Sequence, residues 1–366
     1  MADDGRRLVC GEICAETNRN CASRISTAFA VTEFVHIRCG NDMRPAFEAS
    51  GLTGRFVRWA DPLCEGPTPG GVDAQEWRAL RAGYATARYG ISLQDAERFL
   101  DEQERALEGS VSADEIVLWF EHDQFDQFIL IRLLDWFAAR KIAQDRLSLV
   151  CIDHYPGIEH FHGIGQLGAD ALDALFAERV PVSDTQFALA RRAWAAFCAA
   201  DPRGLETLLT EDTSDLPFLA GAILRHFEDF PGTLDGLART ERNALLAAAS
   251  GDTNPGEIFG VCQAMEEARW CGDTMFWGWL RAMAQAPMPA LVLTGPEDWY
   301  HSREGIEATK IGLTRAGHAL MRGAVNWVRM GGVDRWMGGV HLEGRTATWR
   351  WDNAKRRLVD GSGRYG

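Results

Sequence analysis

The sequence of 366 residues has no run of 18 consecutive apolar residues, the length that a helix needs to cross a bilayer. Near its start it also has no continuous apolar segment followed by a small-residue cleavage site, so we expect no signal peptide. Together these absences predict a cytoplasmic protein without a membrane partner. The oligomeric state is left open.

Basic residues are few relative to acidic ones: 38 Lys and Arg face 52 Asp and Glu, which gives a formal net charge of −14 at pH 7. Broad contact with the phosphate backbone of nucleic acid needs a concentrated basic face. The composition therefore disfavours nucleic acid as a partner, although it leaves room for a local basic patch. The hydrophobic content of 46% is enough for a sizeable core.

The nine cysteines form no recognisable metal or disulfide pattern. Their number is odd and most stand alone in apolar segments, which predicts reduced thiols in a cytoplasmic protein. The closest group is Cys10, Cys14 and Cys21, whose spacing matches no zinc motif. Residues 1–33 around them show no sustained periodicity, so we expect a poorly ordered N-terminal extension.

Several nucleotide and nucleophile motifs are also missing. The turn at Gly40-Asn41 lacks the full G-x-G-x-x-G spacing, so NAD binding is disfavoured, and there is no Walker A loop or protein-kinase set. A G-x-S-x-G motif is absent as well, which sets aside the α/β-hydrolase nucleophile. The turn at Gly40-Asn41 can still bring a phosphate to the N-terminus of the following helix, where unpaired N–H groups point outward.

The N-terminal part of the sequence alternates apolar strands with amphipathic helices. The predicted strands are residues 33–40, 54–63, 115–121 and 146–153. The predicted helices are residues 41–51, 74–90, 92–109 and 126–141. Ser92 and Asp95 form a candidate capping box, and CEGPTPGG at 64–71 predicts a long turn because glycine and proline disfavour both helix and ladder. Because the strands are apolar on both faces, we expect a covered parallel sheet, a Rossmann-like α/β domain over residues 34–168.

The C-terminal part is predominantly helical in pattern. Residues 169–235 are alanine-rich, and we expect a helical linker or subdomain there. Residues 236–360 add further helices and a small hairpin with its turn at Glu343-Gly344. The predicted caps of two of these helices are Asn254 and Asp273. Helices closed by such a hairpin predict a winged-helix-like C-terminal domain.

Polar residues gather immediately after each predicted strand. In open parallel sheets, ligands bind beyond the carboxyl ends of the strands, at the point where the strand order reverses. The candidate residues at these ends are Gly40, Asn41, Asp42, Asp61, Gly66, Glu121, His122, Asp123, Gln127 and His154. We therefore expect the acidic and imidazole side chains to converge at a common rim of the sheet.

The Glu121-His122-Asp123 triplet is the most informative of these groups. Asp123 can cap the following helix and Glu121 can favour the positive end of its dipole, but His122 is needed for neither role. An imidazole that titrates near neutrality beside a carboxylate is suited to acid–base chemistry. Alternatively, this triplet holds a divalent metal ion, with Asp42 or Asp61 arriving from neighbouring strands. A plain helix cap is an equally open interpretation for Asp42.

Two further groups have both a functional and a structural interpretation. His154, His160 and His162 fall in one loop and can chelate zinc, but no Cys or H-E-x-x-H motif accompanies them. Arg81 and Arg88, seven residues apart on one helical face, can clamp a phosphate or carboxylate group. A solvated helix face is the alternative for the two arginines.

Several long stretches carry a resemblance to a known family. They include VHIRCGNDMRPAFEASGLTG, WADPLCEGPTPG, VLWFEHDQFDQFILIRLLDWF and VDRWMGGVHLEGRTATWRWD. Over about residues 34–352 the chain resembles the bacterial family known as domain of unknown function 1835. The resemblance implies a Rossmann-like N-terminal domain followed by a helical part, and it carries no reaction. The positions that match the family's motifs are Gly40, Asp42, Asp61, Gly66, Pro67, Glu121, His122, Asp123 and Gln127.

Three functions are consistent with these patterns. The first is an enzyme that acts on a small phosphorylated or nucleotide-like substrate, with His122 as acid or base, Asp123 or Glu121 as its orienter or as a metal ligand, and Arg81 or Arg88 on the anion. The second is a regulatory or nucleic-acid-binding protein that uses the winged helix and the basic, tryptophan-containing segment 349–359. The third is a non-catalytic subunit whose cleft binds a partner. The cofactor is unknown in each case, and a divalent metal is one possibility.

Overall fold

The computed structural model describes residues 32–251 and 254–361. Cys10, Cys14 and Cys21, with almost all of the predicted N-terminal extension, lie outside the described residues. The chain from Glu33 onward groups into one unit by its contacts. The finer domain boundaries expected within it stay predictions.

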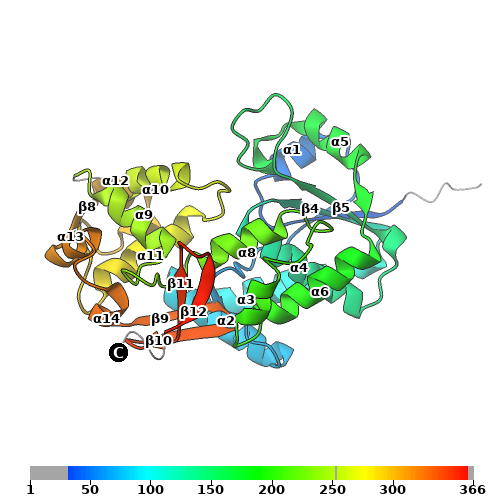
Figure 1. Cartoon of the computed structure of the whole chain (residues 1–366). Helices are drawn as coiled ribbons and strands as arrows, with labels where there is room; N and C mark the ends of the chain where they lie inside the picture. The colour runs from blue at the N-terminus through cyan, green and yellow to red at the C-terminus, as the bar shows by residue number, and fades with distance from the viewer. Residues whose placement is uncertain (1–31, 252–253, 362–366) are drawn as a thin grey trace, which may run out of the picture. The chain divides into compact units, whose positions relative to one another are not determined.

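A five-stranded, mostly parallel sheet forms the N-terminal part of this unit (Figure 1). Its strands are β1 (Phe34–Arg38), β2 (Arg55–Arg58), β4 (Glu115–Glu121), β5 (Leu147–Ile152) and β6 (Val180–Pro181). Their spatial order is β2-β1-β4-β5-β6, and only β6 is antiparallel to its neighbour. The chain therefore adds β2 on one side of β1 and returns to add β4 on the other side. The mixed α/β class and the parallel strands predicted from the apolar pattern are confirmed.

Both faces of the sheet are covered by helices, because side chains alternate along each strand. Val117 and Trp119 of β4 pack into one core cluster with α1 (Arg44–Ala49) and α5 (Ala169–Ala177). The intervening Ile116, Leu118 and Phe120 pack into the main core, which includes α4 (Gln124–Ala139) and α6 (Asp184–Phe197) on the opposite face. Figure 1 shows α1 and α5 on one side of β4 and β5, with α4 and α6 on the other. This is why β4 is apolar without interruption.

Helices make up most of the remaining structure, and within the described residues none of them is both long and apolar enough to cross a membrane. The long helices near the sheet are α2 (Ala74–Tyr89), α3 (Leu93–Glu108), α4 (Gln124–Ala139), α6 (Asp184–Phe197) and α8 (Leu219–Phe227). The others are α7 (Arg203–Thr207), α9 (Arg239–Ala248), α10 (Pro255–Ala264), α11 (Asp273–Gln285), α12 (Arg303–Ala308), α13 (Arg315–Met321) and α14 (Trp327–Gly331). A small antiparallel pair joins β7 (Leu291–Thr294) and β8 (Lys310–Leu313).

The helix caps predicted at Ser92 and Asn254 are confirmed, and the one predicted at Asp273 is wrong. The Ser92 side chain accepts the N–H of Asp95 at 3.1 Å, and Asn254 accepts the N–H of Glu257 at 2.9 Å within a complete capping box. Asp273 was expected to cap α11, but the cap residue is Gly272. Asp273 instead occupies the first turn, where its charge still favours the helix dipole.

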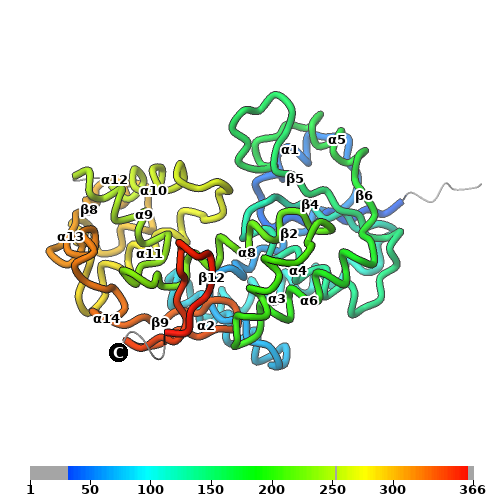
Figure 2. The backbone as a smooth tube through the Cα atoms, in the orientation of Figure 1, coloured from blue at the N-terminus to red at the C-terminus, as the bar shows by residue number. Residues whose placement is uncertain are grey.

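The segment predicted as a long turn at residues 64–71 contains a short strand, β3 (Gly66–Pro67). It pairs in parallel with the end of β9 (Val333–Gly338), and Thr68 N donates to the Gly338 carbonyl at 3.0 Å. Proline is compatible with this pairing because a two-residue strand needs no donor from Pro67. Figure 2 shows the β9 segment beside the part of the chain that contains α2. The C-terminal strands are thus attached to the segment that follows β2.

The position predicted for the hairpin turn, Glu343-Gly344, is wrong. β10 (Val340–Gly344) pairs with β9, whereas β11 (Trp349–Asp352) pairs with β12 (Arg357–Asp360) in a separate sheet. The first hairpin turns at Gly338-Gly339. Gly338 has φ of +65°, and a Cβ on Gly339 would lie 2.0 Å from the Cys198 carbonyl oxygen. Only glycine fits such a turn, so the glycine pair sets the hairpin and Gly344 merely ends β10.

Candidate functional site

A buried arginine, Arg38, connects the carboxyl ends of β1 and β4. Its guanidinium donates to Asp42 Oδ2 at 2.9 Å and forms short ion pairs with Glu121 and Asp126. The chain leaves β1 toward α1 on one face of the sheet and leaves β4 toward α4 on the other face. This divergence between neighbouring parallel strands is where open α/β sheets bind ligands.

The loop after β1 is shaped around this ion-pair network. Asp42 was open to interpretation as a helix cap, but Met43 occupies the cap position of α1, and Asp42 is bound to Arg38. A Cβ on Gly40 would lie 2.9 Å from Asp42 Oδ1, so the glycine leaves room for the carboxylate. Asn41 accepts from Arg44 through both its carbonyl and its side chain. The residues predicted at this strand end therefore hold the Arg38 network together.

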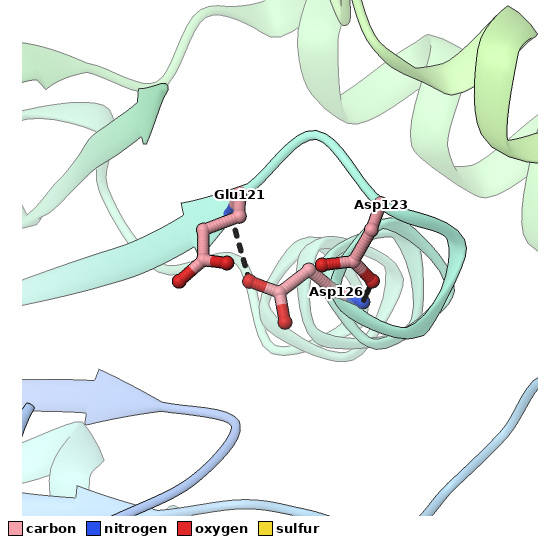
Figure 3. Close-up of side chains that lie close together, drawn as sticks. All are labelled: Glu121, Asp123 and Asp126. Carbon is pink, nitrogen blue, oxygen red and sulfur yellow. Dashed lines mark hydrogen bonds between the residues drawn. The ribbon is translucent and has the colours of Figure 1, made fainter. Parts of the chain in front are cut away.

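Three buried carboxylates follow β4 (Figure 3). Glu121, Asp123 and Asp126 each place an oxygen within 4.8 Å of the others. Asp126 accepts the Glu121 N–H at 2.7 Å and the Cys39 thiol at 2.7 Å. Asp123 caps α4 by accepting the N–H groups of Phe125 at 2.8 Å and Asp126 at 3.1 Å. The cap predicted for Asp123 is thus present, and it fixes where α4 begins.

The acidic cluster holds more negative charge than Arg38 alone neutralises. Burial raises the pKa of Glu121 to about 8, with Asp126 adding to the shift and Arg38 opposing it. Burial together with the charges of Asp126 and Glu121 also raises the pKa of Asp123 well above its usual range. At neutral pH the cluster therefore retains protons. Protonation and Arg38 together relieve the repulsion between these carboxyl groups.

The spacing of these three carboxylates is suited to a divalent cation, but their lone pairs are largely engaged. Arg38 donates to one oxygen of Glu121 and to one of Asp126, and the N–H of Ile164 donates to Glu121 Oε1 at 2.7 Å. Asp123 is committed to the first turn of α4. A metal at this cluster would have to displace Arg38, so the metal expected as a possibility stays a prediction.

His122 lines a pocket of about 720 Å³. Asp123 and Gln124 share the pocket wall with it, and the Phe218 ring lies edge-on to the imidazole at 6.0 Å between centroids. Nδ1 is buried without a well-formed hydrogen bond, although the carbonyl groups of Ile152 and Glu267 lie nearby. Burial lowers the pKa of His122, so the neutral ring predominates at pH 7.

The wall of the His122 pocket contains both acids and arginines. The acids are Asp123, Glu228 and Glu267, and burial raises the pKa of Asp123. The arginines in its wall are Arg225, Arg239, Arg242 and Arg356. Arg239 pairs with Glu228 at 2.7 Å, and the exposed Arg356 comes from the turn between β11 and β12. Arg225 pairs with Asp229 and Glu266, and Arg242 pairs with Asp235, so three of the four arginines in the wall are already paired with acids.

The residues predicted after β2 do not join either group. Asp61 and Arg81 form a buried ion pair, and every guanidinium nitrogen of Arg81 donates to Asp61 or to carbonyls of residues 62–67. Gly66 has φ of +79°, and a Cβ there would lie 2.7 Å from Arg81 Nη1. This arrangement orders the turn and leaves Arg81 no donor for an anion. The side chains expected at one common rim of the sheet therefore lie in separate groups. Asp42 and Glu121 both bind Arg38, whereas Asp61 and His122 line different pockets.

The remaining predicted residues have separate positions. Gln127 donates to the Glu121 carbonyl at 2.6 Å and so closes the turn between β4 and α4. Arg88 pairs with Glu65 at 3.3 Å and lines another cavity. His154 is exposed and contacts its neighbour Asp153 at 2.6 Å. Of these residues, only Gln127 supports the strand end predicted to carry the site.

Sequence reasoning missed four residues that define the two groups. Arg38 ends an otherwise apolar strand, which is a signal, because a charge at a buried position requires a buried partner. Asp126 lies three residues after Asp123 and was interpreted only as part of a helix. Arg239 and Arg242 belong to α9 in the helical C-terminal part, where no motif distinguishes them from surface residues.

Comparison with known proteins yields no family for the chain. The resemblance to domain of unknown function 1835 is therefore neither supported nor contradicted, and the site has to be interpreted from its own geometry. No protein-family model matches the chain, and no curated protein matches it.

Proposed function

We propose that the protein is an enzyme that acts on a small phosphorylated substrate bound in the His122 pocket. The observation that carries the proposal is the coexistence, in one cavity of about 720 Å³, of a neutral imidazole and several arginine side chains. A cavity of this size is typical of small-molecule sites. The Rossmann-like classification of the sheet and the resemblance to domain of unknown function 1835 belong to the same proposal, and the divergence of the chain after β1 and β4 favours them.

His122 is proposed as the general base. A base must be unprotonated at the working pH and must reach the proton that it removes. Burial lowers the pKa of His122 and keeps the ring neutral, while the negative charges of Asp153 and Asp126 stabilise the imidazolium that forms during transfer. Asp123 has a positioning role, because it caps α4 and thereby fixes the backbone next to His122.

The arginines are proposed to bind the phosphate group. Arg356 and Arg242 enter the pocket from the β11–β12 turn and from α9, so a bound anion would be held between elements that are distant in the chain. Arg242 is oriented by Asp235 at 2.8 Å. Arginine suits this role because its planar donor set matches phosphate oxygens. This assignment replaces Arg81 and Arg88 as the anion-binding residues.

The test combines a binding assay with a turnover assay. Inorganic phosphate and pyrophosphate are titrated by calorimetry, and a panel of sugar phosphates and nucleotides is followed by phosphorus NMR. We expect Arg356→Gln to weaken phosphate binding about tenfold, since one charged hydrogen bond contributes about 1.5 kcal/mol or more. His122→Asn should abolish turnover while changing the free energy of unfolding by less than about 1 kcal/mol.

Two variants serve as matched controls. Arg357→Gln changes the neighbouring exposed arginine, which does not line the pocket, and His154→Asn changes an exposed histidine outside it. Both should bind and react like the unmodified protein. The proposal would be rejected by an absence of phosphate binding, by equal effects of Arg356→Gln and Arg357→Gln, or by full turnover in His122→Asn.

A further inference from the structure

A cavity of about 620 Å³ is lined by residues of helices α2, α3, α4 and α6. Its volume lies within the range of about 300–1,000 Å³ that is typical of sites for small molecules. Among the described residues, its wall has none in common with the wall of the His122 pocket. The function proposed above therefore makes no use of this cavity.

Most of the charged residues in the wall of this cavity already have a partner. Six of the eight are ion-paired or cap a helix, and they are Asp61, Asp73, Arg78, Asp101, Arg105 and Glu108. The other two are Glu104 of α3 and Arg132 of α4, and neither forms an ion pair with any described residue. One acid and one arginine are thus left without an ion-pair partner in the same wall.

Glu104 and Arg132 are near each other and are not sealed from the cavity. Burial raises the pKa of the Glu104 carboxyl, and the charge of Arg132 opposes this shift, so the two charges interact although they form no ion pair. Both side chains are half-buried. No Glu104 oxygen and no Arg132 nitrogen belongs to the buried, unpartnered atoms of the described residues. Two separated charges of opposite sign are suited to a ligand that carries both an ammonium and a carboxylate group.

Two tryptophans form part of the apolar wall beside these charges. The rings of Trp77 on α2 and Trp194 on α6 have centroids 5.9 Å apart and planes inclined at 58°. Both rings are half-buried and line the cavity. The Arg132 guanidinium lies 5.6 Å from the centre of the Trp194 ring. A ligand carboxylate bound to Arg132 would therefore bring the rest of the ligand next to an indole surface, which favours an apolar or aromatic group there.

We infer that this cavity binds a free amino acid with an aromatic or large apolar side chain. The carboxylate of the amino acid binds Arg132, its ammonium group binds Glu104, and its side chain packs against Trp77 and Trp194. Arginine suits the first role because its planar donor set matches a carboxylate, and the Glu104 carboxylate accepts from an ammonium group. The inference does not rest on the reaction proposed for the His122 pocket, because no described residue lines both cavities. Each of the two can fail without the other.

The first test compares ligands on the unmodified full chain and needs no variant. L-Phenylalanine and L-leucine are titrated by calorimetry, with the melting temperature as a second readout, and we expect phenylalanine to bind saturably and to raise the melting temperature. Phenethylamine lacks the carboxylate, phenylpropionate lacks the ammonium group, and glycine lacks the side chain. Each should bind at least about tenfold more weakly than phenylalanine, because each loses one of the three contacts.

The second test assigns each charge of the ligand to its residue. Arg132→Gln should remove the advantage of phenylalanine over phenethylamine, and Glu104→Gln should remove its advantage over phenylpropionate. A general loss of structure would weaken all ligands alike and would not give this pairing. Glu102→Gln and Arg191→Gln change exposed charges of α3 and α6 outside the cavity wall, so both should bind phenylalanine like the unmodified protein.

Several results would overturn the inference. They are an absence of binding for both phenylalanine and leucine, or binding of phenethylamine, phenylpropionate or glycine as tight as that of phenylalanine. An unchanged ligand preference in Arg132→Gln or in Glu104→Gln would overturn it as well. If either variant fails to fold, the comparison of ligands on the unmodified protein decides by itself.

Discussion

Between β1 and β4, the single guanidinium of Arg38 faces the carboxyl groups of Asp42, Glu121, Asp123 and Asp126. A buried arrangement of this kind is stable only if the excess charge is removed, and here protons remain on part of the cluster. The result is a network that joins two strands and the first turns of two helices. His122 lies between Glu121 and Asp123 in the sequence and lines the neighbouring pocket.

The raised pKa of Glu121 predicts a stability that falls as pH rises. The folded protein binds this proton up to a pKa of about 8, whereas the group has a usual pKa of 4.5, so its contribution is fully present below pH 4.5 and is lost through pH 8. Because one pKa unit corresponds to about 1.4 kcal/mol, the loss is a few kcal/mol at most. Glu121→Gln cannot ionise and should flatten the curve of unfolding free energy, measured by urea denaturation, between pH 5 and pH 8.

The exposed Glu48 provides the control for this titration, because Glu48→Gln changes a carboxylate outside the cluster. Its unfolding free energy should follow the same pH dependence as that of the unmodified protein. If Glu121→Gln keeps the full slope as well, Glu121 is ionised in the folded state at neutral pH, and Arg38 neutralises the cluster more completely than argued above.

At the level of single residues, the sequence predicted which strand ends carry polar groups but not how these groups divide. Asp42 and Asp61 look alike in the sequence, since each follows an apolar strand. Asp42 pairs with Arg38, whereas Asp61 pairs with Arg81, a residue of α2. The partner of a buried carboxylate depends on the packing of elements, and no local pattern encodes it.

At the scale of elements, α4 depends on the cap that Asp123 provides. Asp123→Ala should lower the free energy of unfolding by about 0.5–2 kcal/mol, because two N–H groups of the first turn lose their acceptor. Asp123→Asn should stay close to the unmodified protein, since asparagine caps helices equally well and the pKa of Asp123 is raised by burial. Chemical denaturation at pH 7 measures both changes.

Asp73 caps α2 in the same way at an exposed position, so Asp73→Ala is the matched control and should show a loss of similar size. The two Asp123 variants also distinguish a role of Asp123 as a helix cap from a role as a catalytic residue. A turnover that is lost in Asp123→Asn, at unchanged stability, would mean that ionised Asp123 takes part in the chemistry, against the positioning role proposed here.

The elements that the sequence predicts well are those with a local cause. The expected helix at 126–141 corresponds to α4 (Gln124–Ala139), and the strand at 146–153 contains β5 (Leu147–Ile152). The short strand β3 was missed because its partner β9 lies in the C-terminal part of the chain. Glycine and proline correctly indicated a bend, but pairing with a distant strand overrode the local tendency.

At the scale of the whole molecule, the arginines of the His122 pocket contrast with the negative net charge of the chain. The chain carries a formal charge of −14, yet the His122 pocket gathers arginines from α8, α9 and the β11–β12 turn. Acids pair with Arg225, Arg239 and Arg242, so the exposed Arg356 is the arginine best placed to attract a small anion, and one such cation does not make the whole surface attractive to polyanions. This contrast favours a small phosphorylated ligand over nucleic acid.

We therefore expect no binding of random duplex DNA in a gel-shift assay at any salt concentration. Arg350, which belongs to the basic segment that the sequence offered for contact with DNA, is buried and cannot lie on a DNA-contacting face. A complex that weakens steeply as salt rises would contradict this expectation, since that slope reports released counterions. Lys355→Gln combined with Arg357→Gln would then have to reduce the slope, because both residues are exposed on the β11–β12 hairpin.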